Sequence, residues 1–469
     1  MASLPRPFIP LAIAVCLALP LPTALAQART PKTVLPAPLA APEPTASGRC
    51  NEDDAGMSRR GLDASLLETG TGDPRVQMQE LIGLAVTRSK GLGAVRLLAD
   101  AAKSDFDETR ALRLPTATLS LAGNGVNNTI NGFNAGRGSQ LNGTLSSSVS
   151  VWDFGRIAKL TDWRKELADV ALQGQRSAEE QLSLNIVSLA LDRSRFVLQA
   201  QVYQQFVRKM ACLVDALQII TQADRGRASE LVQAQKSLQQ ADLSLEQSMS
   251  SLRQTEVRMR RLVGDALPPS MGMTSVLAVL PDLELMQADI LLGPDVAQAE
   301  AQARSQRSFA ESVIAGQKPS VALTGNAIRQ TGVSKATEIQ GGFQVTIPIL
   351  QPGAEAQASA AVKRYRATVL QRDEAIEAKR YRLLEMHEVA ASTLDRARRI
   401  VEILRNSERV RASTLQQWQQ LGRRSLFDVM AAEGDYYSMR VAHVNAMFDT
   451  QQVVALIWSM GRGVAAPLR

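Results

Sequence analysis

Hydrophobic and polar residues alternate along the stretch from Gln140 to Arg156. One set of positions is largely apolar: Leu141, Gly143, Leu145, Val149 and Val151. The positions between them are polar: Gln140, Asn142, Thr144, Ser146, Ser148 and Ser150. Ser147 is the one polar residue on the apolar side. A period of two is typical of a β-strand with one apolar and one polar face. Roughly 12 residues are enough for a tilted strand to cross a bilayer.

Two aromatic residues, Trp152 and Phe154, lie at the end of this stretch. Membrane strands place aromatic side chains where lipid meets water, so we expect these two to mark such an interface. Gly155 follows and allows the chain to turn. The residues after it have the pattern of a very long helix. The sequence therefore predicts a membrane strand that leads directly into a long helix.

Three other segments alternate in the same way. Residues 116–126 place Ala117, Leu119 and Leu121 on one side, and residues 321–327 and 339–349 show the same period with apolar residues on alternate positions. The segments between paired strands, 127–139 and 329–337, are rich in polar residues and glycine, which is typical of external loops. The sequence therefore predicts four strands in two hairpins.

The helix after Gly155 extends over residues 156–221, which contain no proline. Its heptad positions are apolar with the exception of Arg193. These positions are Leu182, Ile186, Leu189, Arg193, Phe196, Ala200, Tyr203, Val207, Met210, Val214 and Leu217. Such a helix is on the order of 100 Å long and needs partner helices beside it. Residues 224–227 break the pattern, and a helix over 229–263 returns, so we expect an antiparallel hairpin.

The second half of the chain repeats this plan. Helical patterns cover 76–112, with an interruption near Gly91 and Gly93, and 294–317 ahead of the two strand pairs. A second long helix over 354–421 is broken at 422–424 and followed by a helix over 425–460. Pro115 matches Pro319, and Gly226 matches Gly422. A tandem duplication accounts for these landmarks. The predicted organisation is a first repeat over 76–264, a linker over 265–290, a second repeat over 291–462 and a tail over 463–469.

The N-terminus has the pattern of a secretory signal peptide. Arg6 precedes an apolar run, and Ala24-Leu25-Ala26 forms a cleavage site, which predicts removal of residues 1–26. A membrane anchor is the alternative, but the apolar run is short and interrupted by prolines. Residues 27–75 read as a flexible leader. Cys16 lies in a poor lipoprotein box, because bulky Val15 precedes it.

Composition argues against nucleic-acid binding and against catalysis. The net charge is +7 over 469 residues, and basic residues interleave with acidic ones rather than forming a basic face. The two histidines, His387 and His443, both fall in helical patterns, so zinc sites and Ser-His or Cys-His catalysis lack their usual residues. We expect no enzyme activity, cofactor or metal. Cys50 and Cys212 remain after signal removal, either as a disulfide or as two independent thiols.

Four strands with apolar faces cannot close a barrel within one chain, and lipid does not tolerate open sheet edges. Small membrane barrels need about eight strands or more. The pattern therefore favours several identical copies, each of which contributes four strands.

The order of these elements resembles the TolC family of outer-membrane efflux and secretion channel proteins over residues 75–462. The local motifs that carry the resemblance are LPTATLSL (114–121), WDFGR (152–156), ILQPG (349–353) and GRRSLFDVMAAE (422–433). The resemblance implies an α+β membrane protein: a homotrimer whose twelve-stranded outer-membrane β-barrel continues into a long α-helical coiled-coil barrel in the periplasm. The implied location is the outer membrane of a Gram-negative bacterium, in contact with its lipid.

The resemblance also implies a periplasmic gate at the two helix breaks, Gly226 and Gly422. Asp428 matches an acidic position of the constriction, whereas Ala431 stands where the family often has a second Asp. Arg424 matches a basic residue that helps to lock the closed tip. Leu231 occupies the position of its acidic partner in other members, and Glu230 is the nearest candidate. The alternatives are a helix N-terminal acid for Asp428 and an ordinary solvated charge for Arg424.

As a member of this family, the chain would conduct substrates passively from an inner-membrane exporter. One version is type I secretion of a protein such as a toxin, with a periplasmic membrane-fusion adaptor and an ABC transporter. The alternative is small-molecule or multidrug efflux with a proton-driven pump. The absence of a convincing lipid-acceptor cysteine favours the first version. A structural coiled-coil protein of the cell surface is a more remote alternative.

Overall fold

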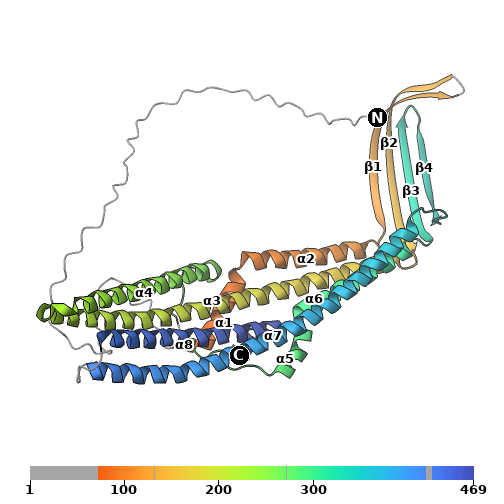
Figure 1. The fold of residues 1–469 in the computed structure, drawn as a ribbon. Coiled ribbons are helices and arrows are strands. Elements are labelled where there is room, and N and C mark those ends of the chain that lie inside the picture. The colour runs from red at the N-terminus through yellow and green to blue at the C-terminus, as the bar shows by residue number, and fades with distance from the viewer. Residues whose placement is uncertain (1–71, 131–132, 271, 419–424, 469) are drawn as a thin grey trace, which may run out of the picture. The chain divides into compact units, whose positions relative to one another are not determined.

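The computed structural model describes residues 72–468, apart from 131–132, 271 and 419–424. The predicted signal peptide and residues 27–71 of the predicted leader lie outside the described residues. The described part consists of long helices and one four-stranded antiparallel sheet (Figure 1). None of its helices combines the length and the apolar composition needed to cross a membrane.

In chain order, the first predicted repeat supplies α1 (Pro74–Arg88), α2 (Lys90–Ala111), α3 (Arg156–Ala223) and α4 (Ala228–Val263). The second supplies α6 (Pro294–Ala315), α7 (Ala354–Gln416) and α8 (Leu426–Met460), and α5 (Leu283–Asp289) lies between the two repeats. Figure 1 shows α4 beside α3 and α8 beside α7, and both pairs are in contact along their length. The predicted helical hairpins are therefore present.

The interruption between α1 and α2 falls at Ser89 rather than at the predicted Gly91 and Gly93. Ser89 has an extended backbone, with φ −65° and ψ 110°, and its hydroxyl oxygen accepts a hydrogen bond from the Leu92 N–H at 3.2 Å. A serine at this position satisfies one of the free N–H groups at the start of a helix. The side-chain cap of Ser89 therefore decides where the first helix ends, and the two glycines are accommodated inside α2.

The heptad predicted for the long helix matches the buried face of α3. Ile186, Leu189, Met210 and Leu217 are buried, and the partly buried heptad residues pack against the same clusters. A large cluster joins α1, α3, α4 and α8, and a smaller one joins α3, α4 and α8 where α8 begins. Because α3 contacts α1, α2, α4, α6 and α8, it is the central element of the helical part.

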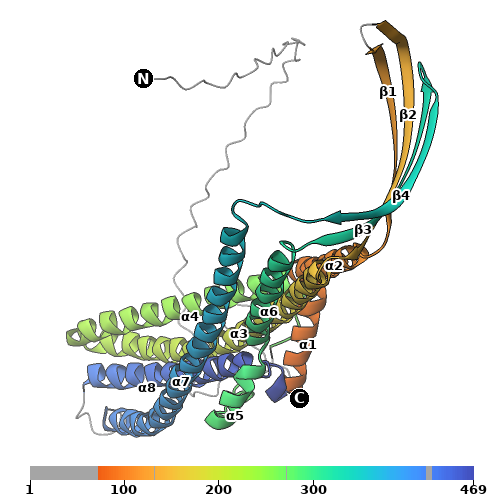
Figure 2. The same cartoon turned by 90° about the vertical axis from the view of Figure 1, so that its right-hand side faces the viewer.

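The sheet has the strand order β1 (Thr116–Ile130), β2 (Phe133–Trp152), β3 (Ser320–Gly332) and β4 (Ala336–Thr346), as Figure 2 shows. Residues that lie side by side on neighbouring strands form rows across the sheet, and each row is either mostly apolar or mostly polar. One row across the four strands is Leu119, Leu145, Ala327 and Ile339. The next row is Thr118, Ser146, Asn326 and Gln340. Since successive side chains point to opposite faces, the sheet has one largely apolar and one polar face.

Ser147, the exception in the alternating pattern, lies in a row of small residues with Ala117, Gly325 and Gly341.

The predicted ends of the strands need correction. Residues 127–130 and 133–139 belong to β1 and β2 rather than to a loop, with a register shift between Asn128 and Thr129. Asparagine and glycine favour turns, but backbone pairing with a neighbouring strand continues through them. At the other end, β4 stops at Thr346 instead of Ile349, since Pro348 has no N–H to donate.

The predicted linker contains a helix. α5 lies inside residues 265–290, and the Asp282 carboxylate caps it by accepting hydrogen bonds from the N–H groups of Glu284 and Leu285. The residues after α8 are also ordered against the helices. Val464 and Leu468 are buried in the cluster around α1 and α3, and the Val464 N–H donates to Glu180 Oε1 at 2.6 Å. Both connecting segments therefore contribute to the core.

Candidate functional site

The apolar face of the sheet is exposed to solvent in a single copy of the chain. The exposed fractions are 71% for Leu121, 80% for Ile339 and 72% for Phe343. Soluble proteins seldom expose contiguous apolar surfaces of this kind. The outer edges of β1 and β4 have no neighbouring strand within the described residues. The sheet therefore has both an uncovered apolar face and two unpaired edges.

The junction between β2 and α3 is built from Trp152, Asp153, Phe154 and Gly155. The ring centroids of Trp152 and Phe154 are 4.2 Å apart, and both side chains are exposed. Phe154 and Gly155 have φ angles of 51° and 81°, which turn the chain from the strand into the helix. The Asp153 carboxylate accepts hydrogen bonds from the N–H groups of Gly155 and Ile157 at 3.1 and 2.7 Å. The sequence identified the aromatic pair, whereas the cap by Asp153 comes from the structure.

The corresponding junction between β4 and α7 is simpler. Gly353 has a φ of 89°, and no side chain caps the helix after it. Leu350 and Pro352 occupy the places of Trp152 and Phe154, and Leu350 is 84% exposed. Both long helices therefore start after a glycine in a left-handed conformation, which side chains with a Cβ seldom adopt.

At the first helix break, Asp224 organises the turn. Its Oδ1 accepts a hydrogen bond from the Gly226 N–H at 3.0 Å, and residues Arg225–Arg227 form a short 3₁₀ turn. Glu230 lies in the first turn of α4, where a negative charge is favourable. Its Oε2 atom is buried and has no hydrogen-bond partner in the described part of the chain. Gly226 thus lies at the tip of the first hairpin, as predicted.

At the second helix break, Gly422 and Arg424 lie outside the described residues, so their predicted roles stay predictions. Asp428 lies in the first turn of α8 and forms a capping box with Ser425. The Asp428 N–H donates to Ser425 Oγ, and the Ser425 N–H donates to Asp428 Oδ2, both at 3.3 Å. The interpretation of Asp428 as a helix N-terminal acid therefore has direct structural support, and its role in a constriction stays a prediction.

The sequence reasoning missed a buried charged cluster near the start of α8. Glu433 is fully buried. Its Oε1 lies 3.7 Å from Lys209 Nζ of α3, and its Oε2 lies 3.6 Å from an Arg411 Nη of α7. Glu433 lies four residues after Val429 and three after Met430, so it falls on the apolar face of α8. An acidic residue on that face is the sequence signal that could have revealed the cluster. The cluster therefore connects α3, α7 and α8 close to the second helix break.

The exception in the heptad of α3 has a partner on α4. Arg193 is nearly buried, and its guanidinium lies 2.9 Å from Glu256 Oε1. It also donates a hydrogen bond to the Pro268 carbonyl oxygen at 2.7 Å. Arg193 therefore links both helices of the first hairpin to the segment that follows them.

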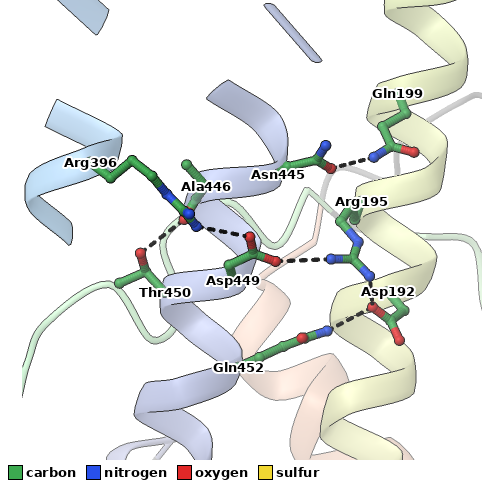
Figure 3. A network of polar contacts seen from close by, with 9 residues as sticks. All are labelled: Asp192, Arg195, Gln199, Arg396, Asn445, Ala446, Asp449, Thr450 and Gln452. Atoms are coloured by element: carbon green, nitrogen blue, oxygen red, sulfur yellow. Dashed lines mark hydrogen bonds and ion pairs between the residues drawn. The ribbon is translucent and has the colours of Figure 1, made fainter. Parts of the chain in front are cut away.

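A second polar network joins α3, α7 and α8 (Figure 3). Arg195 lies 2.7 Å from Asp192 and 3.1 Å from Asp449. Arg396 of α7 approaches the other oxygen of Asp449 at 3.3 Å, and Gln452 donates to Asp192 at 2.6 Å. These contacts fix the two long hairpins to each other between the breaks and the sheet.

Burial is the main cause of the shifted pKa values of three groups, Glu180, Tyr203 and His443. It raises the pKa of the Glu180 carboxyl, which holds the C-terminal segment, and lowers the pKa of the His443 imidazole on α8. Within the described residues, no group of three or more His, Cys, Asp or Glu side chains could hold a metal ion. The structure records Cys212 as disulfide-bonded, while Cys50, its partner in one of the two alternatives given above, lies outside the described residues.

Comparisons with known proteins show the fold. No protein-family model matches the chain, and no curated protein matches it. Solved structures do match. CusC, whose structures concern folding and transmembrane channel formation, has a TM-score of 0.75 at 17% identity, over 82% of this chain and 92% of CusC. The open state of the MtrE outer-membrane channel of Neisseria gonorrhoeae has a TM-score of 0.73 at 17% identity, over 84% and 90%.

The outer-membrane protein VceC of Vibrio cholerae gives a TM-score of 0.71 at 17% identity, over 82% of this chain and 96% of VceC. TM-scores above 0.7 over most of each chain show that these proteins share the fold of this chain. The chain therefore has the TolC-type channel-tunnel fold, and the resemblance seen in its sequence is confirmed for the fold.

Proposed function

We propose that this chain is one protomer of an outer-membrane channel of the TolC type, which conducts substrates passively from an inner-membrane exporter to the cell exterior. The observation that carries this proposal is the sheet: one apolar face exposed across four strands, with unpaired edges on β1 and β4. The shared fold with CusC, MtrE and VceC supports it.

The proposed assembly is a homotrimer. A sheet in lipid must pair all its edges, so β1 of one copy would pair with β4 of the next. Three copies of a four-stranded sheet give a barrel of twelve strands, well above the minimum of about eight. In the same assembly the helical hairpins of three copies would form one tunnel in the periplasm. The helix breaks at Gly226 and Gly422 would then lie at the end away from the membrane.

For the cargo, we propose type I secretion of a protein, with a periplasmic membrane-fusion adaptor and an ABC transporter of the inner membrane. The support is the poor lipid-acceptor context of Cys16 in the sequence. Small-molecule efflux with a proton-driven pump is the alternative, and the two make opposite predictions in a deletion strain. The exposed apolar face of the sheet favours either of them over a structural coiled-coil protein of the cell surface.

The test is a deletion strain of the source bacterium, assayed for protein secretion and for sensitivity to dyes and detergents. Loss of a secreted protein with unchanged sensitivity is expected. Retained secretion together with hypersensitivity would replace type I secretion by small-molecule efflux.

Complementation of that strain tests the membrane channel itself, independently of cargo. The variant Ile339→Asp/Phe343→Asp places charges on the apolar face, where a charged side chain facing lipid destabilises the barrel. The matched variant Gln340→Asp/Gln344→Asp places them on the polar face of the same strand. We expect only the second to give heat-modifiable trimers in the outer-membrane fraction. Equal recovery of both variants would contradict the membrane barrel.

A further inference from the structure

Charged residues are absent from the parts of the four strands that lie next to the helices. Residues 114–136, 138–152, 319–328 and 339–354 contain no Asp, Glu, Lys or Arg. On the helical side, the first charged residues around β1, β2 and β3 are Arg113, Asp153, Arg156 and Lys318, and the first after β4 is Glu355. The three basic residues belong to three different strand–helix junctions. The positive charge at this end of the uncharged band is therefore gathered at the junctions of β1, β2 and β3.

The three basic residues lie with the exposed aromatic pair at neighbouring junctions. Lys318 Nζ lies 5.4 Å from the centroid of the Phe154 ring, which in turn contacts the Trp152 ring at a tilt of 34°. The aliphatic part of Arg156 packs against Gly316, close to Lys318. Arg113 immediately precedes β1, which pairs with β2 near this end through Thr116 and Ser148. We call Arg113, Trp152, Phe154, Arg156 and Lys318 the junction collar.

The positive charge of the collar is not neutralised by the chain itself. The one carboxylate in its midst, Asp153, accepts hydrogen bonds from two N–H groups at the start of α3. Arg113, Arg156 and Lys318 are exposed, and none forms an ion pair in the described part of the chain. Elsewhere in α3 and α6 exposed basic residues do find carboxylates, as Lys159 does with Glu311 at 2.7 Å. The collar is therefore a set of unpaired cations beside exposed aromatic rings.

We propose that the junction collar binds the phosphate groups of anionic phospholipids in the leaflet that faces the helices. This inference rests on the proposed outer-membrane function. Aromatic rings favour the boundary between hydrocarbon and headgroups, and Lys and Arg beside them extend to the phosphate level. Each basic residue near an anionic membrane surface contributes on the order of 1 kcal/mol, or about fivefold in affinity. The occupant is lipid rather than free phosphate, because the exposed rings require an apolar partner as well.

The experiment measures quenching of tryptophan fluorescence by brominated phospholipids in vesicles that contain the full-length trimer. The contribution of Trp152 is obtained by subtracting the signal of Trp152→Phe. Brominated phosphatidylglycerol and brominated phosphatidylcholine are compared in turn. We expect a preference of about fivefold or more for phosphatidylglycerol at low salt, falling as salt is raised to about 0.5 M because ions screen the exposed charges.

The decisive variant is Arg113→Gln/Arg156→Gln/Lys318→Gln, which keeps polar side chains of similar length and removes the charge. It should show equal quenching by the two lipids. The control, Arg398→Gln/Arg405→Gln/Arg409→Gln, removes the same charge from exposed positions about 65 to 85 Å along α7 from its first residue and should keep the wild-type preference. If the triple collar variant does not assemble, the salt dependence of the wild type and the single variant Lys318→Gln provide the test.

The outcomes separate this inference from the proposed function. Equal quenching by both lipids in the wild type would overturn lipid binding by the collar while leaving the membrane channel intact. A preference that survives the triple substitution would overturn it as well. Absence of quenching by either lipid would place Trp152 outside the bilayer and would contradict both proposals.

Discussion

The two long helices, α3 and α7, have nearly the same length and occupy equivalent places in the two repeats, yet their surroundings differ. α3 has 68 residues, of which 17 are buried, whereas α7 has 63 residues, of which 6 are buried. α3 packs against helices on several sides, while α7 leaves Leu370, Ile403 and Val410 exposed in a single copy. The two repeats therefore contain equivalent long helices with different environments. α3 is part of the core, whereas α7 has apolar side chains that no other described part of the same copy covers.

The two repeats therefore differ in how much of the long helix the protomer itself covers. In the proposed trimer, α3 stabilises each protomer and the exposed apolar residues of α7 are available for contacts between protomers. Ion pairs formed within one repeat differ in the same sense. Arg193 of α3 pairs with the buried Glu256 of α4, whereas pairs between two residues of α7, such as Arg382–Glu385, are exposed. Arg411 of α7 is an exception, because it approaches the buried Glu433 of α8. Three predictions test the comparison, and each pairs a residue of the first repeat with one of the second.

The largest effect is expected for the buried pair of α3. Arg193→Met leaves Glu256 in the core beside Arg260 alone, at 3.9 Å, and should lower the free energy of unfolding by about 3 kcal/mol or more. Arg382→Met removes an exposed pair in α7 and should cost less than about 0.5 kcal/mol. Denaturant unfolding of the detergent-solubilised protein, followed by circular dichroism, measures both.

The double variant Arg193→Met/Glu256→Met is the control for the ion pair. It removes both buried charges together and should recover much of the lost stability. If Arg193→Met and Arg382→Met have equal effects, α3 is not the more tightly packed helix and the comparison fails.

A smaller effect is expected at the starts of the two helices. Asp153→Ala removes the acceptor of two N–H groups at the start of α3 and should cost about 1 kcal/mol. Gln351 holds the equivalent place before α7, and only its backbone oxygen takes part in the turn, so Gln351→Ala should change stability little. The midpoints of thermal unfolding of the two variants provide the measurement. Equal losses would mean that the cap by Asp153 is unimportant.

The smallest effect on stability is expected at the hairpin tips. Asp428→Asn keeps an acceptor in the capping box, and Glu230→Gln keeps the shape of the first turn of α4, so each should change stability by less than about 0.5 kcal/mol. Measurements of ion conduction through the channel should distinguish the Asp428 variant from the Glu230 variant. If Asp428 lines the constriction, only Asp428→Asn weakens block by multivalent cations in planar-bilayer recordings. Unchanged block would leave Asp428 with its capping role alone.

Prediction from the sequence succeeded for features that repeat locally. The alternation over 140–156 and the heptad of α3 identified the elements and their apolar faces, because one residue's environment recurs every two or every three to four positions. It failed at the ends of strands. Asparagine and glycine at 127–139 predicted a loop, but pairing between β1 and β2 continues through most of that segment. Strand ends depend on the partner strand, which local composition does not describe.

The sequence by itself determined the long helices, the break near Gly226, the four strands and the presence of a charged residue on the apolar face of α3. Only the tertiary structure decided which residues meet. Glu256 is 63 residues from Arg193, and β2 pairs with β3 of the other repeat to form one apolar row. The physical reason is that a local pattern fixes which face of an element must be covered, whereas the covering partner is selected by packing between segments far apart in the chain.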